Sequence, residues 1–222
     1  MSNRKLIVYS DFICPFCYIG KVNAERLSHK YPDLEIEWRE FELHPEGQPD
    51  PNSFYMKQAQ ESLNHLAQKY DIQMKTDVLT TVTSESRKAL MGLEFAKEYG
   101  KANEYHEAVF KAYWVDGQDI GDLDVLVNIV SSIGLNGEQF SSAIRQEVYL
   151  PQVLRSIEDA RQLGVTGVPT FIYGEYMSVG AQPVTMLERL IDTVDNEENQ
   201  RNKKDKVSEV YACGPEGCNF PS

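Results

Sequence analysis

The spacing of apolar residues changes twice near the start of the chain and predicts a strand, a helix and a second strand. Residues 6–9 form a short apolar run, which is typical of a strand buried on both faces. A helix is predicted over 15–30, because Pro15 suits the first helical turn. Apolar and charged residues alternate over 34–38, which predicts a half-buried strand, and a shift of phase at Glu40 predicts a bulge.

The middle of the chain, residues 46–163, shows only helical periodicity after an opening loop. That loop, 46–53, is rich in Pro, Gly, Asp and Asn, and turn residues such as Asn136-Gly137 separate the helical segments that follow. Strand patterns return at 168–173 and 176–179. The two-residue link between them begins with Gly, which predicts a hairpin with a type II′ turn.

Without the helical block, the predicted order is βαβ followed by ββα, which is a thioredoxin-like topology with a mixed sheet. We therefore expect an α/β protein with a discontinuous thioredoxin-like domain formed by residues 1–45 and 164–195. Residues 46–163 are expected to form an inserted helical subdomain, and 183–195 to form a last amphipathic helix. Residues 196–222 are expected to form an exposed polar linker and a Cys-containing C-terminal tail.

The composition of the chain excludes some classes of function. The net charge of the 222 residues is −12, and so acidic a surface repels phosphate backbones and argues against nucleic-acid partners. No run approaches the roughly 18 apolar residues of a membrane span. The N-terminus also lacks the apolar region and cleavage site of a secretory signal. We therefore expect a cytoplasmic protein, whose cysteines are more often catalytic or metal-binding than structural.

The first candidate site is Cys14-Pro15-Phe16-Cys17, between the predicted strand and the start of the helix. A helix N-terminus lowers the pKa of a thiol, and the thiolate is the nucleophile of disulfide exchange. Two cysteines one turn apart reach each other, so we expect Cys14 to be the exposed attacker and Cys17 to resolve the mixed disulfide. Half of a zinc site, or two idle thiols, are the alternatives.

The second candidate is Val168-Pro169, at the start of the strand that follows the helical block. In a thioredoxin-type site, a Pro at this place follows a cis bond and stands opposite the C-x-x-C pair. Although only about 5–6% of X–Pro bonds are cis, the partner motif makes us expect one here. The alternative is a trans Pro that starts an edge strand. A cis bond would leave the backbone of Val168 free to pair with an extended substrate, and Phe16 is the other candidate substrate contact.

Four segments of the chain are Ser10–Gly20, Phe41–Glu46, Gly164–Phe171 and Gly180–Pro183. Together they resemble the DsbA-like thioredoxin superfamily, and most closely its FrnE-like cytoplasmic branch. They also occur in the same order as in that family. The resemblance covers about residues 5–195 and implies thiol–disulfide oxidoreductase activity. It implies Cys14 as nucleophile, Cys17 as resolving thiol and Pro169 as the cis-Pro. It also implies disulfide-containing protein substrates, a thioredoxin- or glutathione-type reductant and no cofactor.

Two features refine this expectation. DsbA carries Pro-His between its cysteines, whereas Phe16 offers neither a donor nor a charge. We therefore expect a couple less oxidising than the about −120 mV of DsbA, and a reductase or isomerase role. Kappa glutathione transferases and hydroxychromene-carboxylate isomerases share the scaffold but carry Ser in place of the first Cys. Because both Cys14 and Cys17 are present here, a glutathione-linked isomerase of aromatic compounds is only a further alternative.

A second pair of cysteines, Cys213 and Cys218, lies in the tail with Gly214, Pro215 and Gly217 between them. Glycines permit a tight reversal, so the pair is predicted to bond and to exchange with Cys14–Cys17 as a second redox pair. Some FrnE-like proteins resemble this arrangement. Two exposed thiols remain an alternative. A zinc site made by all four cysteines is another, and it would make the protein a zinc-binding, redox-responsive or chaperone-like one.

Two smaller signals stay open at this point. Asp11, three residues before Cys14, would either change the thiol chemistry by raising a pKa or moving a proton, or would cap the loop. The aromatic residues of the helical block either belong to the core or line a substrate groove; they are Tyr105, Phe110, Tyr113 and Trp114.

Overall fold

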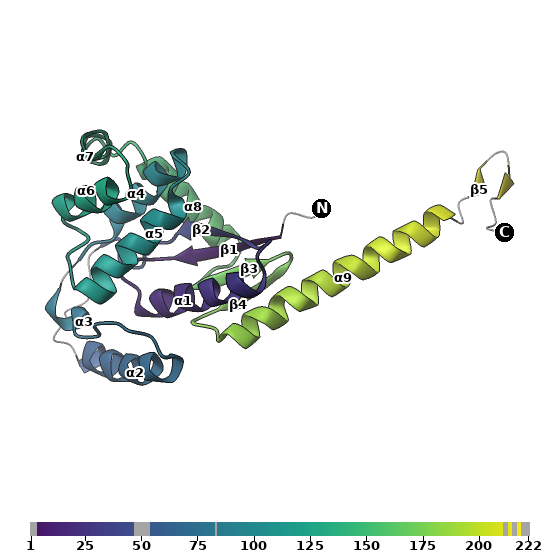
Figure 1. The fold of residues 1–222 in the computed structure, drawn as a ribbon, viewed down its shortest axis with the longest axis horizontal. Helices are drawn as coiled ribbons and strands as arrows, with labels where there is room; N and C mark the ends of the chain where they lie inside the picture. Colours follow the sequence, from purple (N-terminus) through teal and green to yellow (C-terminus); the bar gives the residue numbers. More distant parts are fainter. Residues whose placement is uncertain (1–3, 47–53, 83, 211–212, 215–216, 219–222) are drawn as a thin grey trace.

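The structure is a computed structural model that describes residues 4–46, 54–82, 84–210, 213–214 and 217–218. Its centre is a four-stranded sheet in the order β2-β1-β3-β4 (Figure 1). The parallel pair is β1 (Lys5–Ser10) with β2 (Glu35–Glu40), and the antiparallel strands are β3 (Thr170–Tyr173) and β4 (Tyr176–Val179). The mixed sheet and the thioredoxin-like α/β topology are therefore confirmed.

Helix α1 (Pro15–Lys30) connects the two parallel strands and has the predicted bounds. Pro15 is the first residue of the helix, a position at which a backbone N–H has no acceptor within the helix, so the missing N–H of proline costs no hydrogen bond. It covers one face of the sheet together with the first part of α9, and both helices share a buried cluster with β1 (Figure 1). That cluster contains Leu6, Leu27 and Ile191, each 0% exposed.

Strand β2 runs further than its apolar pattern indicated. Its register with β1 is unbroken from Lys5–Glu35 to Ser10–Glu40, so the predicted bulge at Glu40 is wrong. The inward alternation that includes Trp38 simply continues, and Glu40 is buried although it is charged. Lys97, from a distant helix, supplies its charge partner.

All described residues between β2 and β3 that have regular structure are helical, as predicted. The segments are α2 (Phe54–Tyr70), α3 (Val78–Thr81), α4 (Arg87–Glu98), α5 (Ala102–Lys111), the π-helix η1 (Ala112–Asp116), α6 (Leu123–Ser132), α7 (Gly137–Arg145) and α8 (Leu150–Gln162). The aromatic residues questioned above belong to the core, because Tyr105, Phe110, Tyr113 and Trp114 are all at most 1% exposed.

Helix α8 lies against the other face of the sheet, where Ala160 packs with Tyr9 of β1. The end of the predicted helical insert therefore contributes a layer to the sheet domain. The division of the chain into a thioredoxin-like domain, a helical subdomain and a tail stays a prediction.

The C-terminal part differs most from expectation. The hairpin is as predicted: Gly174 has a φ of 58°, as the first turn position of a type II′ turn requires. Helix α9 (Val184–Val210), however, continues through the expected linker and leads away from the body (Figure 1). The predicted end of the last helix at 195 is wrong, because residues 196–210 are polar but contain no Gly or Pro that would end a helix.

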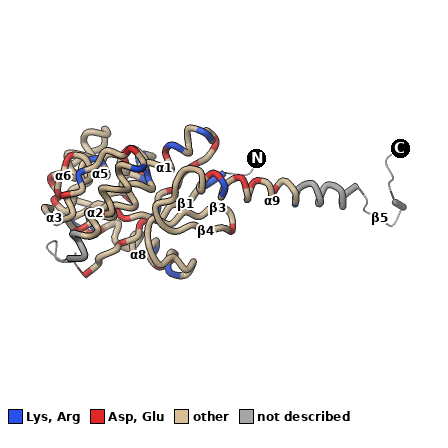
Figure 2. The backbone as a smooth tube through the Cα atoms, turned by 90° about the horizontal axis from the view of Figure 1, so that it is seen from below, with Lys and Arg blue, Asp and Glu red and all other residues tan. Residues whose placement is uncertain are grey.

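Beyond α9, β5 (Cys213–Gly214) pairs with β6 (Gly217–Cys218), with Cys213 opposite Cys218. Within the described residues, no helix is both long and apolar enough to cross a membrane. Acidic and basic positions are interspersed along the described part of the chain (Figure 2).

Candidate active site

Cys14 and Cys17 lie where β1 ends and α1 begins. Cys14 is the N-cap of α1, and its carbonyl accepts the N–H of Cys17 at 3.1 Å. Its own N–H donates to the carbonyl of Asp11 at 3.1 Å, which closes the loop after β1. The sequence places the pair correctly because Pro15 fixes the first turn of the helix between the two thiols.

Both thiols are free and both are buried. Cys14 is 4% exposed and Cys17 is 1% exposed, so the prediction of an exposed Cys14 is wrong for this state. Val168, 154 residues away, covers the Cys14 sulfur, and its carbonyl accepts from Sγ at 3.7 Å. The order of depth is still as predicted, with Cys17 the deeper of the two.

The surroundings of Cys17 hold it as a thiol. Burial raises its pKa well above the ordinary value, and the neighbouring Cys14 raises it further. The N–H of Asp11 points at the sulfur from 3.5 Å and favours the thiolate, but this contact is the weaker influence. Cys17 therefore keeps its proton while Cys14 is free to react first.

The Val168–Pro169 bond is cis, as expected beside the C-x-x-C pair. The carbonyl of Pro169 accepts the N–H of Gly180 at 2.7 Å, which ties this segment to the end of β4. Thr170 closes the other side, where its hydroxyl donates to the carbonyl of Gly167 at 2.6 Å. These contacts present Val168 to Cys14. Phe16 is partly buried and packs at the edge of the same core.

Asp11 organises the loop that carries the thiols. It is fully buried, and its two carboxylate oxygens accept the N–H of Ile13 at 3.3 Å and of Leu43 at 2.8 Å. The loop-capping interpretation is therefore confirmed. Burial raises the pKa of Asp11 to about 6, while the two backbone donors partly offset this rise.

Trp114, which the sequence offered only as a core residue or as the lining of a groove, supports the loop that carries the thiols. Its indole Nε1 donates to the carbonyl of Phe12 at 2.9 Å, in the loop just before Cys14. The π-helical segment η1 carries Trp114, and such segments are frequent near functional sites. No local signal joins positions 12 and 114, because the contact spans 102 residues.

A metal site finds no support among the described side chains, where no three His, Cys, Asp or Glu residues gather as ligands would. The side chains of Cys213 and Cys218 lie outside this description, so the four-cysteine zinc alternative is untested. The register of β5 and β6 nevertheless places the two residues opposite each other.

A model of the DSBA-like thioredoxin domain matches residues 5–192. The chain belongs to this family. Among curated proteins, the DSBA-like chain is 35% identical over 191 residues to the uncharacterized protein YwbO of Bacillus subtilis (strain 168), covering 83% of this chain and 94% of that protein. The assignment of this chain to the FrnE-like branch of the family stays a prediction.

Three solved structures share the DSBA-like fold. A probable DsbA oxidoreductase from Streptomyces coelicolor is 26% identical, with a TM-score of 0.73 and coverage of 98% of this chain and 99% of that one. A 2-hydroxychromene-2-carboxylate isomerase is 21% identical, with a TM-score of 0.72 and coverage of 88% and 98%. The cytosolic disulfide reductase DsbM from Pseudomonas aeruginosa is 18% identical, with a TM-score of 0.66 and coverage of 88% and 99%.

Proposed function

We propose that this protein is a cytoplasmic thiol–disulfide oxidoreductase that reduces or isomerises disulfides of protein substrates through Cys14 and Cys17. The observation that carries the proposal is the arrangement of the two thiols at the start of α1, against the cis Val168–Pro169 bond. Membership of the DSBA-like family supports the same chemistry.

In the reductive direction, the thiolate of Cys14 attacks one sulfur of a substrate disulfide. The substrate S–S bond breaks, its second sulfur leaves as a thiolate, and a mixed disulfide joins Cys14 to the substrate. Cys17 then loses its proton and attacks the Cys14 sulfur, which releases the reduced substrate and leaves a Cys14–Cys17 disulfide. A cellular dithiol or glutathione reduces that disulfide and is itself oxidised.

The two thiols suit these two steps in order. Because burial raises the pKa of Cys17, Cys17 stays mostly protonated and attacks the Cys14 sulfur of the mixed disulfide slowly. That delay gives the mixed disulfide a lifetime, during which a second thiol of the substrate can attack it and isomerise the pairing. Phe16 supplies no charge to stabilise a Cys14 thiolate, so we propose a potential below the about −120 mV of DsbA.

The test is a glutathione redox titration of the metal-free protein, with alkylated thiols identified by mass spectrometry and insulin reduction followed in parallel. We expect a Cys14–Cys17 disulfide that titrates between about −120 and −320 mV, the range from DsbA to the cytosolic poise. Cys14→Ser should abolish insulin reduction, and Cys17→Ser should accumulate the mixed disulfide. Insulin reduction that persists in Cys14→Ser would contradict the proposal.

We also propose that Cys213 and Cys218 form a second redox pair. Residues directly opposite in an antiparallel pair have Cα atoms about 4.5–5.5 Å apart, which falls within the separation that a disulfide spans. In the same titration, a Cys213–Cys218 disulfide should appear, and a Cys213→Ser, Cys218→Ser double variant should change the rate at which Cys14–Cys17 is re-reduced. An unchanged rate would contradict exchange between the tail cysteines and the Cys14–Cys17 pair.

A further inference from the structure

Gly20 occupies an unusual place for a glycine. It lies in the interior of α1, one turn after Cys17, and it is buried. A glycine inside a helix is less favourable than alanine by roughly 0.5–1 kcal/mol. Its φ is not positive, so the backbone conformation does not demand glycine there. The reason must therefore lie in what surrounds it.

The space beside Gly20 is filled by Pro169. A methyl group at Gly20 would lie 2.9 Å from Cγ and 3.3 Å from Cβ of the proline ring, and 3.1 Å from Cζ of Phe171. Carbon atoms at van der Waals contact are about 3.5–4.0 Å apart, so no side chain fits without a shift. The backbone of α1 thus lies directly against the proline ring.

This contact sets where the Val168–Pro169 segment stands relative to the dithiol. Helix α1 supports the ring from one side, and the Gly180 N–H holds the Pro169 carbonyl from the other at 2.7 Å. Between these supports, the carbonyl of Val168 reaches the Cys14 sulfur at 3.7 Å. Because Cys14 caps α1 and Gly20 lies in the second turn of the same helix, a displaced ring changes the distance between the segment and the nucleophile.

We infer that Gly20 is a positioning residue for thiol–disulfide exchange: its missing side chain lets α1 hold Pro169, and with it Val168, against Cys14. The inference rests on the proposed function and adds a residue that touches neither sulfur. A disulfide can be attacked only when the three sulfurs are aligned, and the segment opposite Cys14 determines where a substrate chain lies.

Gly20→Ala is the direct test, and Gly137→Ala is its matched control. At Gly137 an added methyl group would also meet an atom at 2.9 Å, the Ser131 hydroxyl, but in the contact between α6 and α7. Both variants are first shown to be folded by circular dichroism. We expect Gly20→Ala to slow insulin reduction about tenfold, in line with the large effect of small misplacements on rate. Gly137→Ala should keep the wild-type rate.

A second readout separates positioning from general damage. The Val168 carbonyl lies 3.7 Å from the Cys14 sulfur, which is buried beneath it. When that carbonyl is displaced, the alkylation profile, meaning the rate at which iodoacetamide alkylates each thiol at a fixed pH, should show a faster Cys14 in Gly20→Ala with Cys17 still protected. Partial unfolding would instead expose both thiols and accelerate the alkylation of both.

A double-mutant cycle with Pro169→Ala identifies the contact itself. Without the ring, an alanine at position 20 no longer meets Cγ, so Gly20→Ala should have less effect in the Pro169→Ala background. If Gly20→Ala alone fails to fold, recovery of folding in the double variant supports the same contact.

The outcomes separate the two claims. A wild-type protein that does not exchange disulfides overturns the proposed function and leaves Gly20 to be judged by the alkylation profile. An active wild type, together with a Gly20→Ala variant that keeps both its rate and its alkylation profile, overturns the role of Gly20.

Discussion

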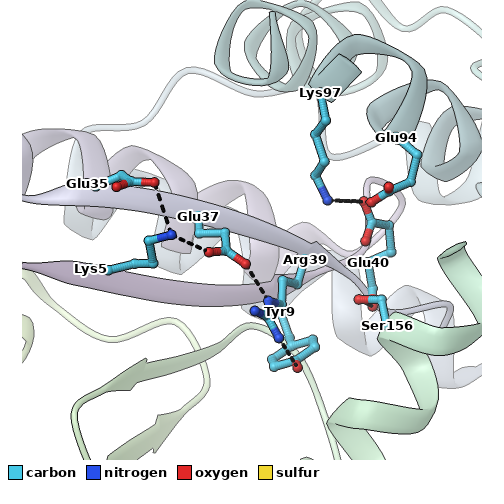
Figure 3. A network of polar contacts seen from close by, with 9 residues as sticks. All are labelled: Lys5, Tyr9, Glu35, Glu37, Arg39, Glu40, Glu94, Lys97 and Ser156. Carbon is cyan, nitrogen blue, oxygen red and sulfur yellow. Dashed lines mark hydrogen bonds and ion pairs between the residues drawn. The ribbon is translucent and has the colours of Figure 1, made fainter. Parts of the chain in front are cut away.

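Two buried carboxylates stand side by side at the ends of the parallel strands, and their surroundings are opposite in kind. Asp11 directly follows β1, and Glu40 ends β2 opposite Ser10. Both carboxylate oxygens of Asp11 accept hydrogen bonds from backbone N–H groups, one from Ile13 and one from Leu43. Glu40 instead meets other charges: its Oε1 accepts from Lys97 at 2.7 Å, and the carboxylate of Glu94 lies next to it (Figure 3).

Burial raises the pKa of both groups, to about 6 for Asp11 and to about 7 for Glu40. The second oxygen of Glu40, Oε2, has no hydrogen-bond partner among the described residues. The comparison shows that two equally buried carboxylates have different structural roles. Asp11 fixes the backbone of the dithiol loop, whereas Glu40 belongs to a small charge cluster whose stability depends on pH.

The largest effect should follow from removing the cation of that cluster. Lys97→Met leaves the carboxylates of Glu40 and Glu94 without Lys97 at pH 8, and a buried charge that loses its partner costs about 3–5 kcal/mol. Near pH 4.5 Glu40 is protonated, so the loss should shrink. Urea unfolding at both pH values measures it. An equal loss at the two pH values would show that packing, and not charge, is what Lys97 supplies.

Glu40→Gln should act in the opposite direction. Because the pKa of Glu40 is higher in the folded protein than in the unfolded chain, the folded state binds more protons between pH 4.5 and 7. The free energy of unfolding therefore falls as pH rises through that window, by about 3 kcal/mol from this group. The neutral Gln should remove this fall and leave the variant more stable than wild type at pH 8.

Glu37→Gln is the matched control for that measurement. Glu37 lies on the same strand and pairs with Lys5 and Arg39, and its pKa is lowered by those partners despite some burial (Figure 3). Its neutral variant should not gain stability at pH 8. A gain of similar size in both variants would mean that overall negative charge, rather than the burial of Glu40, is responsible.

The same comparison shows where sequence reasoning succeeds. The bounds of α1 are readable because Pro15 and Pro32 mark the chain locally. The cis Val168–Pro169 bond is also predictable, because a second motif far away in the sequence gives the proline a role.

Two of the wrong predictions, those for Glu40 and Cys14, share a cause: the residue that contacts each of them lies far away in the sequence. Glu40 was expected to disturb its strand, yet Lys97, 57 residues on, lets it remain in register. Cys14 was expected to be exposed, yet Val168 covers it. The predicted helix end at 195 was wrong for a different reason: the polarity of 196–210 was taken to indicate an irregular chain, although no Gly or Pro in that segment ends a helix.

Asp11→Asn gives the smallest change in stability and the sharpest change in local structure. An amide keeps one acceptor oxygen but turns an NH₂ group toward the second backbone N–H, so either Ile13 or Leu43 loses its partner. At the same time the buried charge disappears, which above pH 6 offsets part of the loss. The net change in unfolding free energy at pH 8 should therefore be about 1 kcal/mol or less.

Amide hydrogen exchange should nevertheless resolve this variant clearly. Leu43 donates the shorter of the two bonds, at 2.8 Å, and its protection should fall by about tenfold or more when that bond is lost, since 1.4 kcal/mol corresponds to a factor of ten. Glu40→Gln should leave the protection of Leu43 unchanged, because its own contacts are to side chains and to α8. If both variants opened the same amides, the two carboxylates would form one cooperative unit, and the distinction between a backbone clamp and a charge cluster would fail.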